Sequence, residues 1–172
     1  MTVTLEEGSL RFRFDDALVP WKYDASSFYR NHFQSFAGGA KGVDFLCQTR
    51  DTLWLIEVKD CRAHDRQKSQ DLGEEVAEKV RDTLAGLAVL RVNGNDLAEK
   101  KRAAAALKQK RLRVVLHLEL PKLKRVSKLY PSVKLNFDIQ EHLKAVVRAV
   151  DPHPKVVSLS DGLQHCPWTV MD

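Results

Sequence analysis

The sequence predicts an α/β fold in which a mixed sheet of about five strands is flanked by helices. Three observations lead to this fold class. Residues 42–60 hold two apolar, strand-like runs separated by a polar turn. Residues 71–92 carry apolar side chains at the three- and four-residue spacing of a helix. Two later apolar strands, 112–120 and 155–159, each follow a helical segment, which favours parallel pairing.

The chain has the size and composition of one globular domain. It has 172 residues, of which 44% are apolar and 30% charged. We expect an N-terminal arm or edge strand over 1–23, a core over 24–160 and a tail over 161–172. No apolar run reaches the roughly 18 residues of a membrane span, and the N-terminus lacks the regions of a signal peptide. Three cysteines without zinc-ligand spacing indicate reduced thiols, so we expect a cytoplasmic protein with no membrane partner.

The N-terminal part contains one alternating segment and one short helical segment. Leu10 to Phe14 alternate apolar and basic side chains, which predicts the edge strand or arm. A short helix is expected over about 26–35, where aromatic residues repeat at helical spacing. Gly38 and Gly39 then end this helix and lead into the hairpin.

The hairpin of residues 42–60 is the most informative part of the sequence. With Arg50-Asp51 as its turn, Phe45 faces Ile56 and Asp44 lies opposite Glu57. Side chains on a strand alternate between its two faces, so Glu57 and Lys59 share a face with Leu55.

Asp44, Glu57 and Lys59 are therefore predicted to converge on one small patch. Opposed carboxylates repel unless a cation lies between them, and carboxylate oxygens suit Mg²⁺ or Mn²⁺. The Lys59 ammonium could orient a metal-bound water or stabilise developing negative charge.

The pattern Asp44…Glu57-Val58-Lys59 resembles the signature of the PD-(D/E)xK nuclease superfamily, the fold of restriction endonucleases and Holliday-junction resolvases. The resemblance implies an α-β-β-β-α-β core over about 24–160 and metal-dependent hydrolysis of phosphodiesters. By the same resemblance, Asp44, Glu57 and the backbone carbonyl of Val58 would bind the metal, and Lys59 would be the catalytic lysine. Val43 replaces the proline that often precedes the first acid. Asp24 is the local candidate for a further metal ligand, or else a helix N-cap.

The hairpin is followed by a polar loop and then by the clearest helix. Arg62, Arg66 and Lys68 of this loop either contact a phosphate backbone or are solvated loop charges. The helix over 71–92 is expected to present Lys79 to solvent, paired with acids of its own helix.

The second half of the chain alternates helices and strands. Asp96 is expected to cap a helix from Leu97 to about Lys110. The strand at 112–120 should lie parallel to the Glu57 strand, and a helix over 136–150 should lead to the strand at 155–159.

Charge is distributed unevenly along the chain. Between Lys100 and Lys134 there are twelve Lys or Arg and one acid, a local net charge of +11 in a chain whose total is +5. Such asymmetry favours a polyanionic partner over the alternative of a solvated basic surface. The predicted nucleic-acid-binding residues of this window are Lys100, Lys101, Arg102, Lys108, Lys110, Arg111, Lys122, Lys124 and Arg125.

Taken together, the residues and the resemblance predict a Mg²⁺-dependent nuclease that acts on DNA in repair or foreign-DNA defence. The alternative is a catalytically silent protein of the nuclease fold that binds nucleic acid or a protein partner within a larger assembly. A third interpretation is a structural domain whose basic helix is merely hydrated. Cleavage of both strands of a DNA duplex would favour a homodimer.

Overall fold

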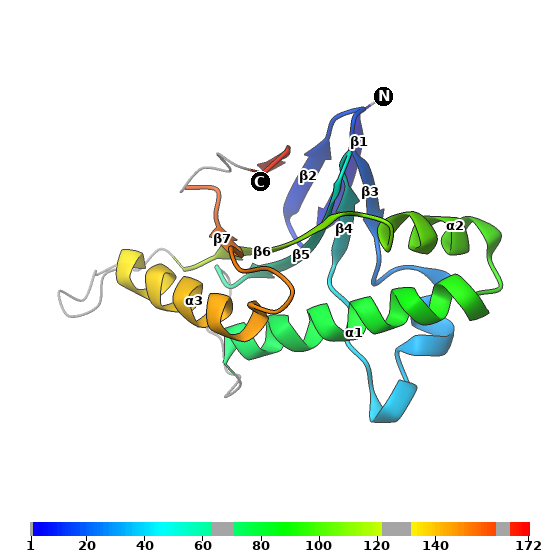
Figure 1. The fold of residues 1–172 in the computed structure, drawn as a ribbon. Helices are drawn as coiled ribbons and strands as arrows, with labels where there is room; N and C mark the ends of the chain where they lie inside the picture. Colours follow the sequence, from blue (N-terminus) through cyan, green and yellow to red (C-terminus); the bar gives the residue numbers. More distant parts are fainter. Residues whose placement is uncertain (1, 63–70, 122–131, 161–165) are drawn as a thin grey trace.

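The computed structural model describes residues 2–62, 71–121, 132–160 and 166–172 (Figure 1). Within these ranges the fold is α/β, with a mixed five-stranded sheet flanked by helices, as predicted. No helix among the described residues is long and apolar enough to cross a membrane.

The five-stranded sheet has the order β3-β4-β5-β6-β7. Its strands are β3 (Val19–Lys22), β4 (Phe45–Gln48), β5 (Thr52–Asp60), β6 (Arg111–Glu119) and β7 (Lys155–Val157). The pairs β3–β4 and β4–β5 are antiparallel, whereas β5–β6 and β6–β7 are parallel. The predicted hairpin register is confirmed, because Phe45 pairs with Ile56 and Cys47 with Trp54.

Three helices cover one face of this sheet: α1 (Leu72–Asn93), α2 (Leu97–Ala106) and α3 (Ser132–Val147). Side-chain carboxylates cap the first two, since Asp71 accepts the N–H of Gly73 at 2.7 Å and Asp96 that of Glu99 at 2.8 Å. The long α1 runs across the sheet with α3 beside it, and α2 lies at the other end of the fold (Figure 1).

A second sheet covers the opposite face. It has the order β1-β2-β8, with β1 (Val3–Glu7), β2 (Leu10–Phe14) and β8 (Trp168–Met171) in antiparallel pairing. The segment expected to be an arm or edge strand is thus the middle strand of a sheet. The tail supplies the third strand, which its weak apolar pattern did not predict.

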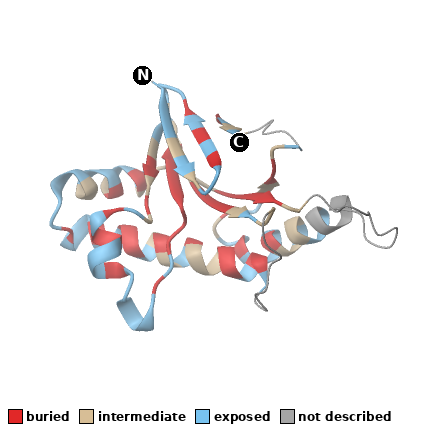
Figure 2. Ribbon diagram, turned by 180° about the vertical axis from the view of Figure 1, so that it is seen from behind, coloured by how far each residue is buried: buried red, intermediate tan, exposed pale blue. Residues whose placement is uncertain are grey.

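The two layers make two separate hydrophobic cores, divided by β5. Leu53 and Leu55 pack among the helices, whereas Ile56 and Val58 pack against the inner side chains of β2, Leu10, Phe12 and Phe14. Buried residues gather on the central strands and on the helix surfaces that face them (Figure 2). Because Glu57 and Lys59 have the parity of Leu55, their side chains point to the helical side.

The short aromatic segment differs from its prediction. In place of one helix over 26–35, the chain forms a π-helix (Tyr29–Phe33) and a 3-10 helix (Phe36–Gly38). Strand β3 was also not predicted, because Pro20 lies within it and proline is confined to edge strands.

Candidate functional site

The three residues of the predicted patch come together at the helical side of the hairpin. Asp44 directly precedes β4, while Glu57 and Lys59 lie on β5. The Lys59 ammonium is 3.0 Å from Glu57 Oε1. Asp44 accepts the backbone N–H of Val58 at 2.7 Å, which holds its carboxylate beside Glu57.

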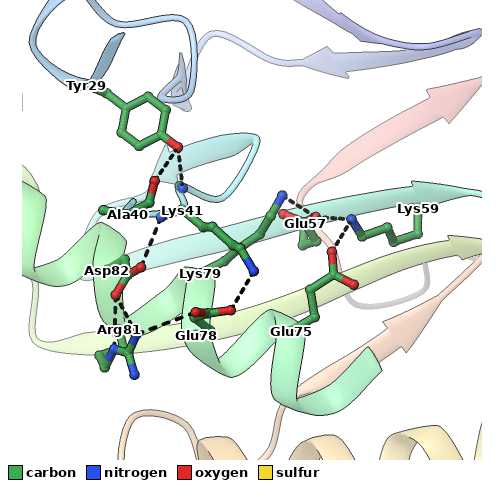
Figure 3. A network of polar contacts seen from close by, with 11 residues as sticks. Tyr29, Ala40, Lys41, Glu57, Lys59, Glu75, Glu78, Lys79, Arg81 and Asp82 are labelled. Carbon is green, nitrogen blue, oxygen red and sulfur yellow. Dashed lines mark hydrogen bonds and ion pairs between the residues drawn. The ribbon is translucent and has the colours of Figure 1, made fainter. Parts of the chain in front are cut away.

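Helix α1 adds two residues that the sequence did not suggest (Figure 3). Lys79 Nζ lies 2.6 Å from Glu57 Oε1 and 3.8 Å from Asp44 Oδ1, and Glu75 Oε1 lies 2.8 Å from Lys59 Nζ. The expectation that Lys79 faces solvent is therefore wrong: its side chain is 15% exposed and contacts the acids of the sheet. Glu57, 1% exposed, is held by two lysines.

Two further acids approach Asp44 from the other side. Carboxylate oxygens of Glu7, Asp24 and Asp44 all lie within 4.8 Å of one another. Glu7 comes from the end of β1, and its Oε2 also lies 2.9 Å from the ammonium of Lys22 on β3. We did not predict Glu7, whereas Asp24 was a candidate ligand from the sequence. Among the described residues, no side-chain hydrogen bond makes Asp24 the cap of the helix that follows it.

Burial and mutual repulsion change the acidity of this cluster. Burial, followed by the charge of Glu57, raises the pKa of Asp44 to about 7. Burial and the nearby Asp44 raise the pKa of Asp24 to about 6. Burial by itself would lower the pKa of Lys59, but the carboxylates of Glu57 and Glu75 raise it overall. The lysines near Asp44 thus do not fully compensate the acids.

The arrangement suits a hard cation better on one side of Asp44 than on the other. The space between Asp44 and Glu57 already holds the Lys79 ammonium. Next to it, Asp24 Oδ1 is buried without a hydrogen-bond partner among the described residues, as is Glu57 Oε2. Orphaned carboxylate oxygens in an acidic group are what a bound Mg²⁺ or Mn²⁺ would satisfy. The donor set Glu7, Asp24 and Asp44 therefore fits a divalent cation.

Three of the predicted basic residues lie at the opposite end of the sheet. Lys108, Lys110 and Arg111 are exposed where α2 leads into β6, and the N–H groups of Lys110 and Arg111 bind the carbonyl of Asp51 in the hairpin turn. In the parallel β5–β6 register, Arg111 lies beside Thr52 and Leu116 lies beside Glu57. At about 3.3 Å per residue, the basic residues begin roughly 17 Å from the acidic centre. The structure does not bring these two predicted sites together.

The remaining predicted nucleic-acid contacts have different surroundings. Arg62 is held by Asp60 and Asp172, both at 2.7 Å, and is not free for phosphate. On α2, the Lys100 ammonium donates to the carbonyl of Val92 at 3.0 Å, and Arg102 lies over the ring of Trp21 at 5.9 Å. The other predicted positions lie outside the described residues: Arg66, Lys68, Lys122, Lys124 and Arg125.

Comparison with known proteins gives one informative match. The chain is similar to a cysteine--tRNA ligase of Neisseria meningitidis serogroup A, at 28% identity over 209 aligned positions. The alignment covers 97% of this chain but only 29% of the ligase, so the chain spans less than a third of the relative's length. No family model matches the chain. No solved structure matches it either.

This match overturns the function predicted from the sequence. The curated relative is a tRNA ligase, so the prediction of a metal-dependent DNA endonuclease in repair or defence is wrong, together with its description as a hydrolase. The prediction relied on three side chains and on the basic window from Lys100 to Lys134, and the surroundings of both differ from the expected ones. A second lysine, Lys79, occupies the gap between the two acids, and Lys108, Lys110 and Arg111 lie at the far end of the sheet.

Proposed function

We propose that this chain is an RNA-binding domain that serves tRNA aminoacylation by holding tRNA for a ligase. The observation that carries the proposal is the similarity of nearly the whole chain to a limited part of a cysteine--tRNA ligase. A part of this size fits an accessory domain better than a complete ligase. A tRNA partner also agrees with the cytoplasmic location expected from the sequence.

The charge distribution supports the same proposal. Residues 97–113 contain seven Lys or Arg and one acid, Glu99, whose carboxylate is engaged by the N–H groups of Ser27 and Phe28. Exposed cations that make no buried contacts are available to phosphates, and phosphate contacts dominate the affinity for nucleic acid. We assign this role to a basic surface formed by Lys101, Lys108, Lys110 and Arg111. Arg111 also pairs with Asp51 at 3.1 Å, but its side chain is 66% exposed, whereas that of Arg62 is 26% exposed and is held by two acids.

The acidic centre has a different role in this proposal. We infer that Glu7, Asp24 and Asp44 bind Mg²⁺ or Mn²⁺, which would supply positive charge to acids that the lysines leave under-compensated. The element order around the hairpin and the Asp44, Glu57 and Lys59 arrangement support descent from a core similar to that of the restriction endonucleases. The present role of this centre is to stabilise the fold.

Fluorescence anisotropy with labelled tRNA tests the RNA-binding role. We expect the Lys108→Ala, Lys110→Ala, Arg111→Ala triple variant to bind tRNA at least tenfold more weakly in low salt. The slope of its log-log salt dependence should become less steep by roughly one for each phosphate that the variant no longer binds. The control is Lys144→Ala with Arg148→Ala, which removes two exposed positive charges near the end of α3, one fewer than the triple variant removes. Equal weakening in both variants, or no tRNA binding by the parent protein, would contradict the proposal.

A further inference from the structure

The aromatic segment before the hairpin forms a stack of rings that ends at the surface. The rings of Phe28 and Phe33 are 6.2 Å apart and 26° from parallel, and those of Phe33 and Phe36 are 5.4 Å apart and 17° from parallel. Phe28 and Phe33 are buried, but Phe36 is 61% exposed. The outer face of Phe36 is thus a preorganised aromatic surface at the end of the stack.

The backbone after Phe36 keeps this ring in place. Ala37 has a φ of 52°, a conformation uncommon for residues other than glycine, and Gly38 and Gly39 follow with φ of 87° and 127°. The N–H of Gly39 bonds to the carbonyl of Phe36 at 3.0 Å. A compact, strained turn around an exposed phenylalanine is more costly than a polar loop, which points to a use for the ring.

A pocket of about 250 Å³ opens beside the stack. Phe36, His32 and Val89 give it apolar and aromatic walls, and the amide side chains of Asn93 and Asn95 give it hydrogen-bonding groups. Amides offer both donors and acceptors, as the edges of nucleobases do. The volume lies below the roughly 300 Å³ of pockets for drug-sized ligands, so it suits a single flat base.

The pocket adjoins positively charged parts of the chain. Arg30 precedes His32 in the π-helix, Arg91 precedes Asn93 on α1, and both are exposed. Glu99 of α2 accepts the N–H groups of Ser27 and Phe28 at 2.7 and 3.0 Å, so the aromatic segment is fixed directly to the helix that carries Lys100 and Lys101. A phosphate attached to a base in the pocket would meet cations on either side.

We propose that this pocket binds one unpaired nucleobase of an RNA, which stacks on Phe36 while Asn93 and Asn95 contact its edge. Single-stranded RNA is recognised in this way, by unstacked bases on aromatic rings. The inference rests on the proposed RNA-binding function and specifies it: the basic surface would bind the phosphates, and the pocket would bind a base from a loop or an end.

The test uses the full chain and a short single-stranded RNA with 2-aminopurine at its centre. Binding should change the fluorescence of 2-aminopurine, and Phe36→Ala should abolish this change and weaken affinity about tenfold, as expected for the loss of one stacked base. The salt dependence should stay the same. Phe36→Trp should retain binding. The matched control, Val92→Ala, removes an apolar side chain that is 67% exposed and lies outside the pocket lining.

A second measurement separates the pocket from the RNA-binding function. Nucleoside monophosphates are titrated into the protein while NMR signals of the Asn93 and Asn95 side-chain amides, which are present in parent and variant alike, are followed. Shifts that disappear in Phe36→Ala support the pocket even if tRNA does not bind. If Phe36→Ala keeps its affinity for tRNA and gives the same change in 2-aminopurine fluorescence as the parent, the assignment of the pocket to a nucleobase is wrong. The RNA-binding function would then still stand. Binding of a peptide, but of no nucleotide, to the same residues would also overturn it.

Discussion

Both ends of the β5–β6 pair carry basic and acidic side chains, but those at one end are buried and those at the other are exposed to solvent. At the end nearer Glu57, lysines and carboxylates are packed within hydrogen-bonding distance and largely shielded from water. At the end nearer Arg111, cations face solvent, and the ion pair of Arg111 with Asp51 has side chains 66% and 38% exposed. A buried charge determines the stability of the fold, whereas an exposed charge remains available to a partner.

This difference assigns a role to each end. In the buried cluster, removal of one charge leaves its partner without compensation, which is costly in a medium that water does not reach. At the exposed end the same change alters long-range attraction and little else. Stability measurements should therefore respond to the first region and binding measurements to the second.

Among the substitutions discussed here, Lys79→Met should give the largest loss of stability at a single, neutral pH. It removes one of the two ammoniums on Glu57, whose side chain is 1% exposed, and should lower the free energy of unfolding by about 3 kcal/mol. Urea denaturation measures the loss. Lys41→Met is the matched control, because the Lys41–Glu78 pair, at 2.8 Å, is nearly as short, but the lysine is 47% exposed. This variant should lose less than about 1 kcal/mol. Similar losses in both variants would erase the distinction between buried and exposed charge.

Asp44→Asn should change how stability depends on pH. The pKa of Asp44 is raised to about 7 in the folded protein, so its contribution is fully present below the unfolded value near 4 and is lost as pH rises through 7. In EDTA the parent protein should lose about 4 kcal/mol of stability through Asp44 between pH 4 and 8, because the pKa is raised by about three units at about 1.4 kcal/mol each. Asp24, whose pKa is also raised, acts in the same direction.

The Asp44→Asn variant should lose much less over the same range, because an amide does not titrate. Mg²⁺ should restore stability to the parent at pH 8 and not to the variant, as thermal unfolding would report. Asp15→Asn, a change at an exposed position, is the control. A variant with the pH profile of the parent would show that Asp44 is not the group responsible. A Mg²⁺ response of equal size in both proteins would place the cation elsewhere.

Arg62→Ala should have the smallest effect on stability of these substitutions. Its guanidinium joins Asp60 and Asp172 near the surface, where solvent and salt screen ion pairs, so the free energy of unfolding should hardly change. Because these acids already occupy Arg62, tRNA affinity should be unchanged. A clear loss of tRNA binding would return Arg62 to the nucleic-acid contacts predicted from the sequence.

The sequence was informative where a local period determines the structure. The alternation along β4 and β5 gave the register, and the helical spacing of Val76, Val80 and Leu87 gave α1. The parallel order of β5, β6 and β7 followed from the helices between them. These features depend on neighbours in the chain.

The features that the sequence did not predict depend on contacts between distant segments. Glu7 reaches Asp44 because two sheets pack together, and no period in the chain records that contact. Lys79 was assigned to solvent, although it lies between the buried Val76 and Val80 on α1, and this position was the available signal. The predicted nuclease function was wrong for a related reason. Three polar residues indicated a site, but they did not indicate the further lysine and acids that surround them.

Strand β5 also limits how this protein can change in length. Its odd-numbered side chains belong to one core and its even-numbered ones to the other. A single residue inserted in the strand would exchange the two sets, so that Glu57 would be moved from its lysines to the phenylalanines of β2. Insertions and deletions within β5 should therefore be purged in descendants of this sequence, whereas changes of length at Arg50-Asp51 leave both cores intact. Substitutions can therefore alter the composition of this strand, but insertions and deletions cannot shift which of its residues face each core without disrupting both cores.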